Sequence, residues 1–371
     1  MLLSRIDINN QVGIEIGALA KPIISKSDGT IYYADHLSTQ DLRKKYADHS
    51  KLGLVDLDAI VNVDFVLADC SLIEALGDKG PVDYVVASHV IEHLPDTIGW
   101  LQQIAKCLHE GGYLCLAIPD KRFTFDHFRE CSTTRELIAN YLQHVVLPTP
   151  AQVFDHVAHA AEVDAAAVWQ GNTRKRRPID EGHTLDNGLL LARDLMERPV
   201  FHDVHCTVFT PYSFCCLLKD LMSLNLVPYT VAEFATTQHM GTEFHVTLRK
   251  ETETSPEIRT ATVPDLHFSK DHLLPMVTEN CEYMQSQINQ IQSLMTTVGE
   301  RDREIAILHD INAELSASMQ HKVDALNRQN EVLQSLYAST SWKVSSPVRL
   351  VGRLLRSLLR NSKLTQTGRV P

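Results

Sequence analysis

Short apolar runs alternate with stretches of helical spacing up to about residue 250, and this alternation predicts an α/β fold. The run at 84–87 is almost continuously apolar, as are strands buried on both faces of a parallel sheet. Apolar residues from Ile98 to Leu108 then follow a helical spacing, which we expect to end at Gly111 and Gly112. The pattern predicts successive strands at residues 12–16, 30–35, 63–68, 84–87 and 113–118.

Residues from about 120 to 204 do not fit this alternation. From residue 133 onward they have helical spacing, interrupted by Pro148 and Pro150, so we predict a helical cap inserted into the sheet domain. Thr210 then caps a helix at 212–224. Two further strands, at 227–234 and 243–248, complete a domain that we place at 1–250.

The remainder of the chain has a different pattern. Residues 251–277 are polar and punctuated by proline, as linkers are. Apolar residues then recur at steps of three and four, which predicts a long α-helical coiled coil at 278–338. A seam of this length indicates a homo-oligomer, most simply a dimer. The alternative is a single helix folded back on the domain.

The segment 339–371 is a basic amphipathic tail. Its arginines lie three or four residues apart, with leucines between them, as in helices that lie in a membrane surface. We therefore expect peripheral membrane contact through 342–360, with docking on a partner helix or disorder as alternatives.

Composition narrows the function classes. The 371 residues are 44% hydrophobic and 22% charged, enough for one large domain plus an appendage. A net charge of -11 argues against a general nucleic-acid binder, which needs a basic face. The eight cysteines include no Cys-x-x-Cys pair, so we expect neither a zinc cluster nor a disulfide framework. Without a signal peptide or a spanning apolar run, we expect a cytoplasmic protein whose tail reaches the inner face of the membrane.

The residues of the turn after the first strand indicate which of two kinds of nucleotide site the domain could form. A dinucleotide fold needs several glycines to seat a pyrophosphate, and here only Gly17 is present, with Ala20 and Lys21 where further glycines would stand. Glu15 would repel a diphosphate, but it would favour a cationic ligand such as S-adenosylmethionine. Asp35, at the end of the second strand, could accept hydrogen bonds from ribose hydroxyls.

These blocks make the sequence resemble the class I S-adenosylmethionine-dependent methyltransferases, and in particular the methyltransferase type 11-like branch associated with polysaccharide and glycan biosynthesis. The resemblance covers about 10–250 and departs from the family at the turn, where the family carries more glycines. It implies a Rossmann-like seven-stranded sheet closed by an antiparallel hairpin. It also implies cofactor contacts from Glu15, Gly17, Asp35, Asp69, Cys70, Ser88 and His89.

Some of these residues also have structural interpretations. Asp69 would face the adenine amino group in the resembled family, or it could belong to a turn or helix cap. His89 and His93 could contact the cofactor or acceptor, or fix their loop by hydrogen bonds. His156 and His159 share one helix face, but we could assign no further ligands and therefore predict no metal site.

Methyl transfer to a sugar hydroxyl would benefit from a base, because the pKa of such a hydroxyl is high. The loop after the fifth strand carries Asp120 and His127 among aromatic residues, which suits a sugar-like acceptor, although an ion-paired loop would have the same composition. His183 follows a basic run, and His205 precedes the predicted helix at 212–224. The candidate bases are His205, His183, Asp120 and His127.

The sequence therefore predicts an S-adenosylmethionine-dependent methyltransferase that acts on a hydroxyl of a glycan, a polysaccharide precursor or another small-molecule acceptor. Two alternatives follow from other features. The scarcity of glycines in the turn fits an inactive scaffold for membrane-associated glycan enzymes. A small-metabolite methyltransferase would share the domain but have no evident use for the tail.

Overall fold

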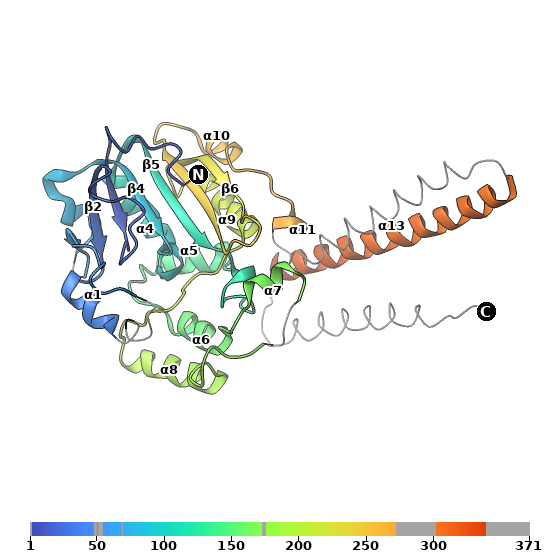
Figure 1. Cartoon of the computed structure of the whole chain (residues 1–371), viewed down its shortest axis with the longest axis horizontal. Coiled ribbons are helices and arrows are strands. Elements are labelled where there is room, and N and C mark those ends of the chain that lie inside the picture. The colour runs from blue at the N-terminus through green and yellow to red at the C-terminus, as the bar shows by residue number, and fades with distance from the viewer. Residues whose placement is uncertain are drawn as a thin grey trace. The chain divides into compact units, whose positions relative to one another are not determined.

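A computed structural model of the chain describes residues 2–47, 50, 55–68, 70–172, 176–271 and 302–338 (Figure 1). The chain divides into two compact units, Met1–Met284 and Gln285–Pro371. Asp69 and residues 173–175 of the basic run lie outside the described residues. So do 272–301, which include the start of the predicted coiled coil, and the whole predicted tail 339–371.

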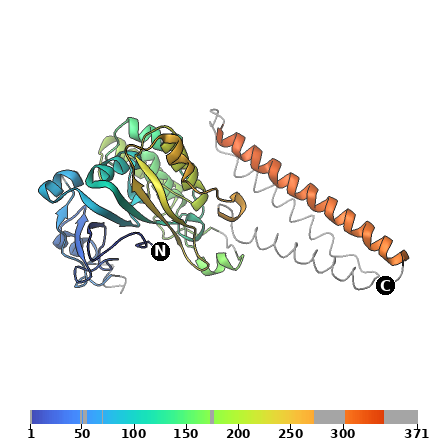
Figure 2. The same cartoon turned by 90° about the horizontal axis from the view of Figure 1, so that it is seen from above.

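The first unit is built on a seven-stranded sheet with the order β3-β2-β1-β4-β5-β7-β6. All neighbours are parallel except β7, which runs antiparallel to both β5 and β6. Figure 2 shows the yellow β6 and β7 beside the teal β5. This confirms the predicted α/β sheet and its closing hairpin. The strands are β1 (Val12–Ile16), β2 (Thr30–Asp35), β3 (Phe65–Val66), β4 (Val82–Ser88), β5 (Leu108–Pro119), β6 (Tyr229–Ala235) and β7 (Glu243–Lys250).

Side chains of the central strands alternate between two cores. On one face, Val85 and Ala87 of β4 pack in the main core with helices α4 (Thr97–Cys107) and α9 (Pro211–Ser223). On the other face, Tyr84 and Val86 pack in a smaller cluster that includes the N-terminal segment. The period of two along a strand explains this division. Both faces are buried, as the apolar run at 84–87 predicted.

The α4–β5 junction differs from the sequence prediction. Helix α4 ends at Cys107, and β5 begins at Leu108, so Gly111 and Gly112 lie within the strand instead of ending the helix. Gly111 has φ +78°, and Leu108 pairs with Val82 of β4. These residues therefore belong to the sheet because the strand on either side of them pairs with β4. The glycines that usually mark a helix end could not reveal this pairing.

Four helices lie between β5 and α9, within the region predicted as a cap. They are α5 (Thr134–Leu142), α6 (Pro150–His159), α7 (Ala165–Trp169) and α8 (Leu185–Glu197). Side chains of α6 and α8 share a separate apolar cluster with the segment before α9, through Val153, Leu195 and Cys206. The described residues before α5 also form the helices α1 (Thr39–Lys45) and α3 (Leu72–Leu76) and the short 3-10 turns η1 (Gly77–Lys79), η2 (Ile91–His93) and η3 (Lys121–Phe123).

Part of the predicted linker is packed structure. Helices α10 (Pro256–Ala261) and α11 (Phe268–Asp271) fall within it. Arg259 of α10 is only 3% exposed and donates hydrogen bonds to Oδ1 of Asn225 at 2.7 Å and to the carbonyl of Val227 at 3.4 Å. These bonds attach the segment to the sheet domain, a long-range effect that its polar composition concealed.

In the second unit, the described residues form one helix, α13 (Asp302–Ala338). Leu315, Val323 and Leu326 are between 39% and 44% exposed in the single chain. The coiled coil itself stays a prediction. Within the described residues, no helix is long and apolar enough to cross a membrane.

Candidate functional site

The turn after β1 has the geometry that a closely approaching ligand needs. Gly17 has φ +74°, a conformation that side chains disfavour, and its N–H donates to the carbonyl of Ala34 on β2 at 3.0 Å. A Cβ at this position would lie 3.0 Å from Cγ2 of Val90. The turn is therefore tight enough to require glycine, and this cradle fits the cofactor position that the sequence predicted.

Glu15 holds the loop that follows this turn. Its carboxylate is 2% exposed and accepts the backbone N–H groups of Ile23 at 2.8 Å and Ile24 at 3.1 Å. Burial raises the pKa of Glu15, against the effect of the two amides. The contact that the structure shows is thus with the loop backbone, and direct contact with a cofactor stays a prediction.

Asp35 and Cys70 lie near the ends of neighbouring strands. Asp35 ends β2, is 7% exposed and forms an ion pair with Nδ1 of His36 at 2.6 Å. Cys70 donates its thiol hydrogen to the Val66 carbonyl at 3.5 Å. The next residue, Ser71, caps α3 in a capping box with Glu74. The Asp35 position fits the predicted ribose contact, because the carboxyl ends of β1 and β2 lie at the same edge of the sheet.

Ser88 ends β4 at this edge, and His89 follows with φ +53°. Nε2 of His89 lies 2.6 Å from Oε2 of Glu243 on β7. That hydrogen bond is the largest influence on the pKa of His89, which is raised. The structure thus gives His89 a charged partner that sequence reasoning did not identify, because Glu243 lies 154 positions along the chain.

Two of the candidate bases, Asp120 and His127, each bond to Arg122 in the loop after β5. Asp120 is fully buried and accepts hydrogen bonds from the Arg122 guanidinium and from the hydroxyl of Thr237 at 2.6 Å. Nδ1 of His127 lies 2.6 Å from the carbonyl of Arg122, to which it donates, and burial lowers the pKa of His127. An enclosed, ion-paired carboxylate is a poor proton acceptor for a substrate, so we exclude Asp120 as the base.

His205 has a different environment. Nδ1 of its ring lies 2.6 Å from Oδ2 of Asp126, and the residue is 7% exposed. Arg129, itself buried, binds the other oxygen of Asp126 at 2.6 Å and the backbone carbonyl of His205 at 2.8 Å. Burial alone would raise the pKa of Asp126, but His205 and Arg129 together lower it to about 2. The ionised Asp126 therefore accepts the Nδ1 hydrogen of His205, and in the neutral form of that ring Nε2 carries the lone pair.

His183 lies near His205, with the ring of His156 between them. Its Nδ1 lies 2.7 Å from Asp180, and its ring centroid is 5.9 Å from that of His156. His156 in turn accepts the backbone N–H of His205 at 3.2 Å. Burial, followed by the charge of Arg129, lowers the pKa of His156 to about 3, so this ring stays neutral. His183 thus lies one ring away from His205.

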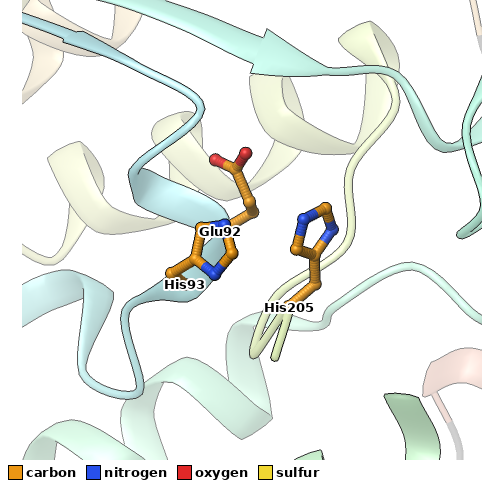
Figure 3. Close-up of side chains that lie close together, drawn as sticks. All are labelled: Glu92, His93 and His205. Carbon is orange, nitrogen blue, oxygen red and sulfur yellow. The ribbon is translucent and has the colours of Figure 1, made fainter. Parts of the chain in front are cut away.

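Glu92, His93 and His205 form a compact cluster that the sequence did not predict. Each offers one donor atom, and these atoms lie within 4.8 Å of one another (Figure 3). Glu92 and His93 come from η2, directly after the end of β4, and His205 comes from the segment before α9. Nothing in the local sequence indicated that His205 would join the Glu92–His93 pair.

Residues 16–168 match the family model described as a methyltransferase domain. A search of curated proteins found no match. Among solved structures, the chain is similar to the magnesium protoporphyrin IX methyltransferase of Synechocystis PCC 6803 with bound SAH, at 9% identity and a TM-score of 0.29, covering 66% of this chain and 76% of the other. A SAM-dependent methyltransferase from Aquifex aeolicus gives 10% identity and a TM-score of 0.28, with 65% and 83% covered.

A Rhodobacter sphaeroides protein described as a zinc-dependent alcohol dehydrogenase is also similar, at 14% identity and a TM-score of 0.36, with 67% and 88% covered. Similarities at these scores carry no argument about the reaction. The family match over 16–168 supports a methyltransferase with S-adenosylmethionine as its cofactor.

Proposed function

Starting from a methyltransferase domain at 16–168, we propose that the protein transfers a methyl group from S-adenosylmethionine to a hydroxyl of a glycan or polysaccharide precursor. The observation that carries the proposal is the position of the Asp126–His205 pair. It lies beside η2, which follows directly from the strand end where the predicted cofactor contacts Ser88 and His89 lie.

The donor side is formed by the adjacent strands β2, β1 and β4. Gly17 turns the backbone sharply at the end of β1, and Asp35 ends the neighbouring strand. When bound, S-adenosylmethionine supplies an electrophilic methyl on its sulfonium. The protein's task is then to hold the acceptor oxygen in line with that methyl, since proximity and orientation supply most of the rate.

The acceptor side is assigned to the cluster of Glu92, His93 and His205. In the transfer, the O–CH3 bond forms, the S–CH3 bond breaks, and the hydroxyl proton passes to a basic group. Nε2 of His205 is suited to accept it, because Asp126 fixes the ring and stabilises its charged form. A positioned base of this kind contributes about 10²–10⁴-fold to the rate.

Support for a sugar acceptor comes from the aromatic residues beside the cluster. The ring of Phe125, which is half-buried, lies 4.5 Å from that of His205, and the ring of His156 lies 5.8 Å from the His205 ring. Aromatic faces next to hydrogen-bonding groups suit the mixed apolar and polar surface of a sugar. The expected membrane contact of 342–360 would bring the enzyme to lipid-linked glycan precursors.

The first test is calorimetric titration of the full chain with S-adenosylmethionine. We expect micromolar binding, about -8 kcal/mol, and we expect Gly17→Val to abolish it. Gly77→Val is the matched control, because Gly77 also has positive φ but no atom lies within 4 Å of its added Cβ. If the folded wild-type chain binds neither S-adenosylmethionine nor S-adenosylhomocysteine, the proposal fails and the scaffold alternative remains.

A further inference from the structure

We infer that Glu92, His93 and His205 bind a divalent transition-metal ion. The three donor atoms lie within 4.8 Å of one another, close enough to share one ion after small side-chain adjustments. Figure 3 shows the three side chains gathered between the η2 turn and the segment that carries His205. Two imidazoles and one carboxylate form a frequent ligand set for Zn²⁺ and related ions.

The carboxylate of Glu92 is the strongest indication of a cation site. The residue is 1% exposed, and neither of its oxygens has a hydrogen-bond partner among the described residues. Nδ1 of His89 lies 3.5 Å from Oε1, too far for a well-formed hydrogen bond. Burying a carboxylate without hydrogen bonds is costly, and a bound cation would remove that cost.

The backbone holds the two parts of the cluster together. The carbonyl of Glu92 accepts N–H groups from Cys206 at 2.6 Å and from Thr207 at 3.0 Å. The hydroxyl of Thr207 also donates to the carbonyl of Ile91 at 3.3 Å. His205 is therefore fixed relative to Glu92 and His93 without any ion, and a site that is already assembled binds metal more readily.

Both histidines have a carboxylate beside Nδ1. Asp126 binds Nδ1 of His205 at 2.6 Å, which directs Nε2 toward a ligand. Oδ1 of Asp203 lies 3.1 Å from Nδ1 of His93, close enough for an ion pair although not aligned as a hydrogen bond. A carboxylate behind a histidine ligand orients the ring and makes it a stronger donor, and such partners are typical of protein metal sites.

The donor set selects the class of ion. Imidazole nitrogen favours Zn²⁺, Co²⁺ and Fe²⁺, and the carboxylate also suits Mn²⁺, whereas Mg²⁺ and Ca²⁺ prefer sites built from oxygen ligands alone. Three protein ligands leave at least one position open, as in catalytic sites. If the proposed function is right, the acceptor hydroxyl would occupy that position. The ion would lower the hydroxyl pKa, the proton would pass to solvent water, and His205 would act as a ligand instead of as the base.

The test uses the full chain after treatment with a chelator and dialysis, without S-adenosylmethionine or acceptor. Calorimetric titrations with Zn²⁺ and Mn²⁺ should each show one ion per chain, and excess Mg²⁺ should not displace Zn²⁺. Co²⁺ should give the visible absorption bands of an ion with nitrogen ligands. Because the assay omits the methyl donor, its failure would leave the proposed methyl transfer intact.

Two variants locate the ion. Glu92→Gln and His205→Gln should each lower Zn²⁺ affinity at least tenfold, and Zn²⁺ should raise the melting temperature of the wild type but not of Glu92→Gln. His144→Gln is the control, because it removes an exposed imidazole outside the cluster. Circular dichroism confirms that each variant is folded. Absence of Zn²⁺, Mn²⁺ and Co²⁺ binding to the folded wild type, or unchanged binding in both variants, would overturn the inference.

Discussion

Two buried aspartates in one loop show how partners decide the role of a residue. Asp120 is enclosed by Arg122 and Thr237, so its charge is balanced within the loop. Asp126 instead binds His205, and Arg129 keeps it ionised. From the sequence we predicted Asp120 as a candidate base because Asp120 follows a strand. We did not predict Asp126. Both aspartates lie next to aromatic residues in the sequence, so only the residues that they contact in the fold distinguish their roles.

At this scale we predict that Asp126→Asn lowers kcat for methyl transfer about 100-fold, since an asparagine would hold the Nδ1–H tautomer of His205 less firmly than a carboxylate, whether Nε2 takes the proton or binds an ion. The affinity for S-adenosylmethionine should stay within a factor of two or so of the wild type, because the residue lies on the acceptor side. Asp180→Asn is the control, and it tests whether His183 is the base instead. A larger loss in Asp180→Asn than in Asp126→Asn would favour His183.

A second residue-scale prediction concerns acid stability. Hydrogen bonds from His245 and His89 lower the pKa of Glu243 to about 2, from an ordinary value of 4.5. A lowered folded-state pKa stabilises the protein above the ordinary value, and this contribution is lost as the pH falls toward the folded value. Between pH about 5 and about 2, the melting temperature of Glu243→Gln should therefore fall less than that of the wild type.

The control for this comparison is Glu197→Gln, an exposed carboxylate at the end of α8. Its melting temperature should follow the wild-type curve across the same range. Parallel curves for Glu243→Gln and the wild type would contradict the assigned ion pairs.

At the scale of elements, the contact between β1 and β4 sets the position of the cofactor turn. Gly13 lies in β1, and an added Cβ would come within 2.0–2.6 Å of the ring of Tyr84, which is fully buried. The aromatic ring thus occupies the space that a side chain on β1 would need. This close packing fixes β1 against β4, and through β1 it fixes the turn at Gly17.

We accordingly predict that Gly13→Ala destabilises the fold by about 1–3 kcal/mol, the usual cost of overpacking a core. Urea unfolding measures it as a lower midpoint with an unchanged slope. Gly182→Ala, in an exposed loop, should change the midpoint little. A Gly13→Ala midpoint equal to the wild type would mean that the strands separate more easily than the structure indicates.

At the scale of the whole molecule, the exposed apolar residues of α13 remain to be explained. Leu315 and Leu326 are 39% and 40% exposed on a helix of 37 residues. Most helix stability in proteins comes from packing an apolar face, and these two leucines stay partly exposed in the single chain. Self-association through 278–338 would supply that packing, and we propose it as the reason for the spacing.

The corresponding prediction is that the full chain sediments as a dimer, and that the double variant Leu315→Glu, Leu326→Glu sediments as a monomer. Charges at seam positions would be buried without partners, which opposes association. Gln320→Glu adds a charge away from these positions and should leave the dimer intact. Sedimentation equilibrium distinguishes the cases, and a monomeric wild type would refute the oligomer.

The sequence alone determined the order of the strands and the positions of α4 and α9, because the alternation of apolar residues is a local property that each element carries in itself. Periods of two and of about 3.6 placed β1, β2, β4 and α9 within a few residues of their observed bounds, and the turn at Gly17 was visible from its composition. Helix and strand ends were less certain where pairing with a neighbour decided them, as at Gly111 and Gly112.

Only the tertiary structure decided which side chains meet. Asp126 reaches His205 across 79 positions, and His205 joins Glu92 only because the segment before α9 bonds to the η2 turn. Periodicity carries no information about such contacts, since it fixes the face on which a residue lies but not the distant segment packed against that face. The paired acid of His205 and the candidate metal cluster therefore became visible only once the chain was folded.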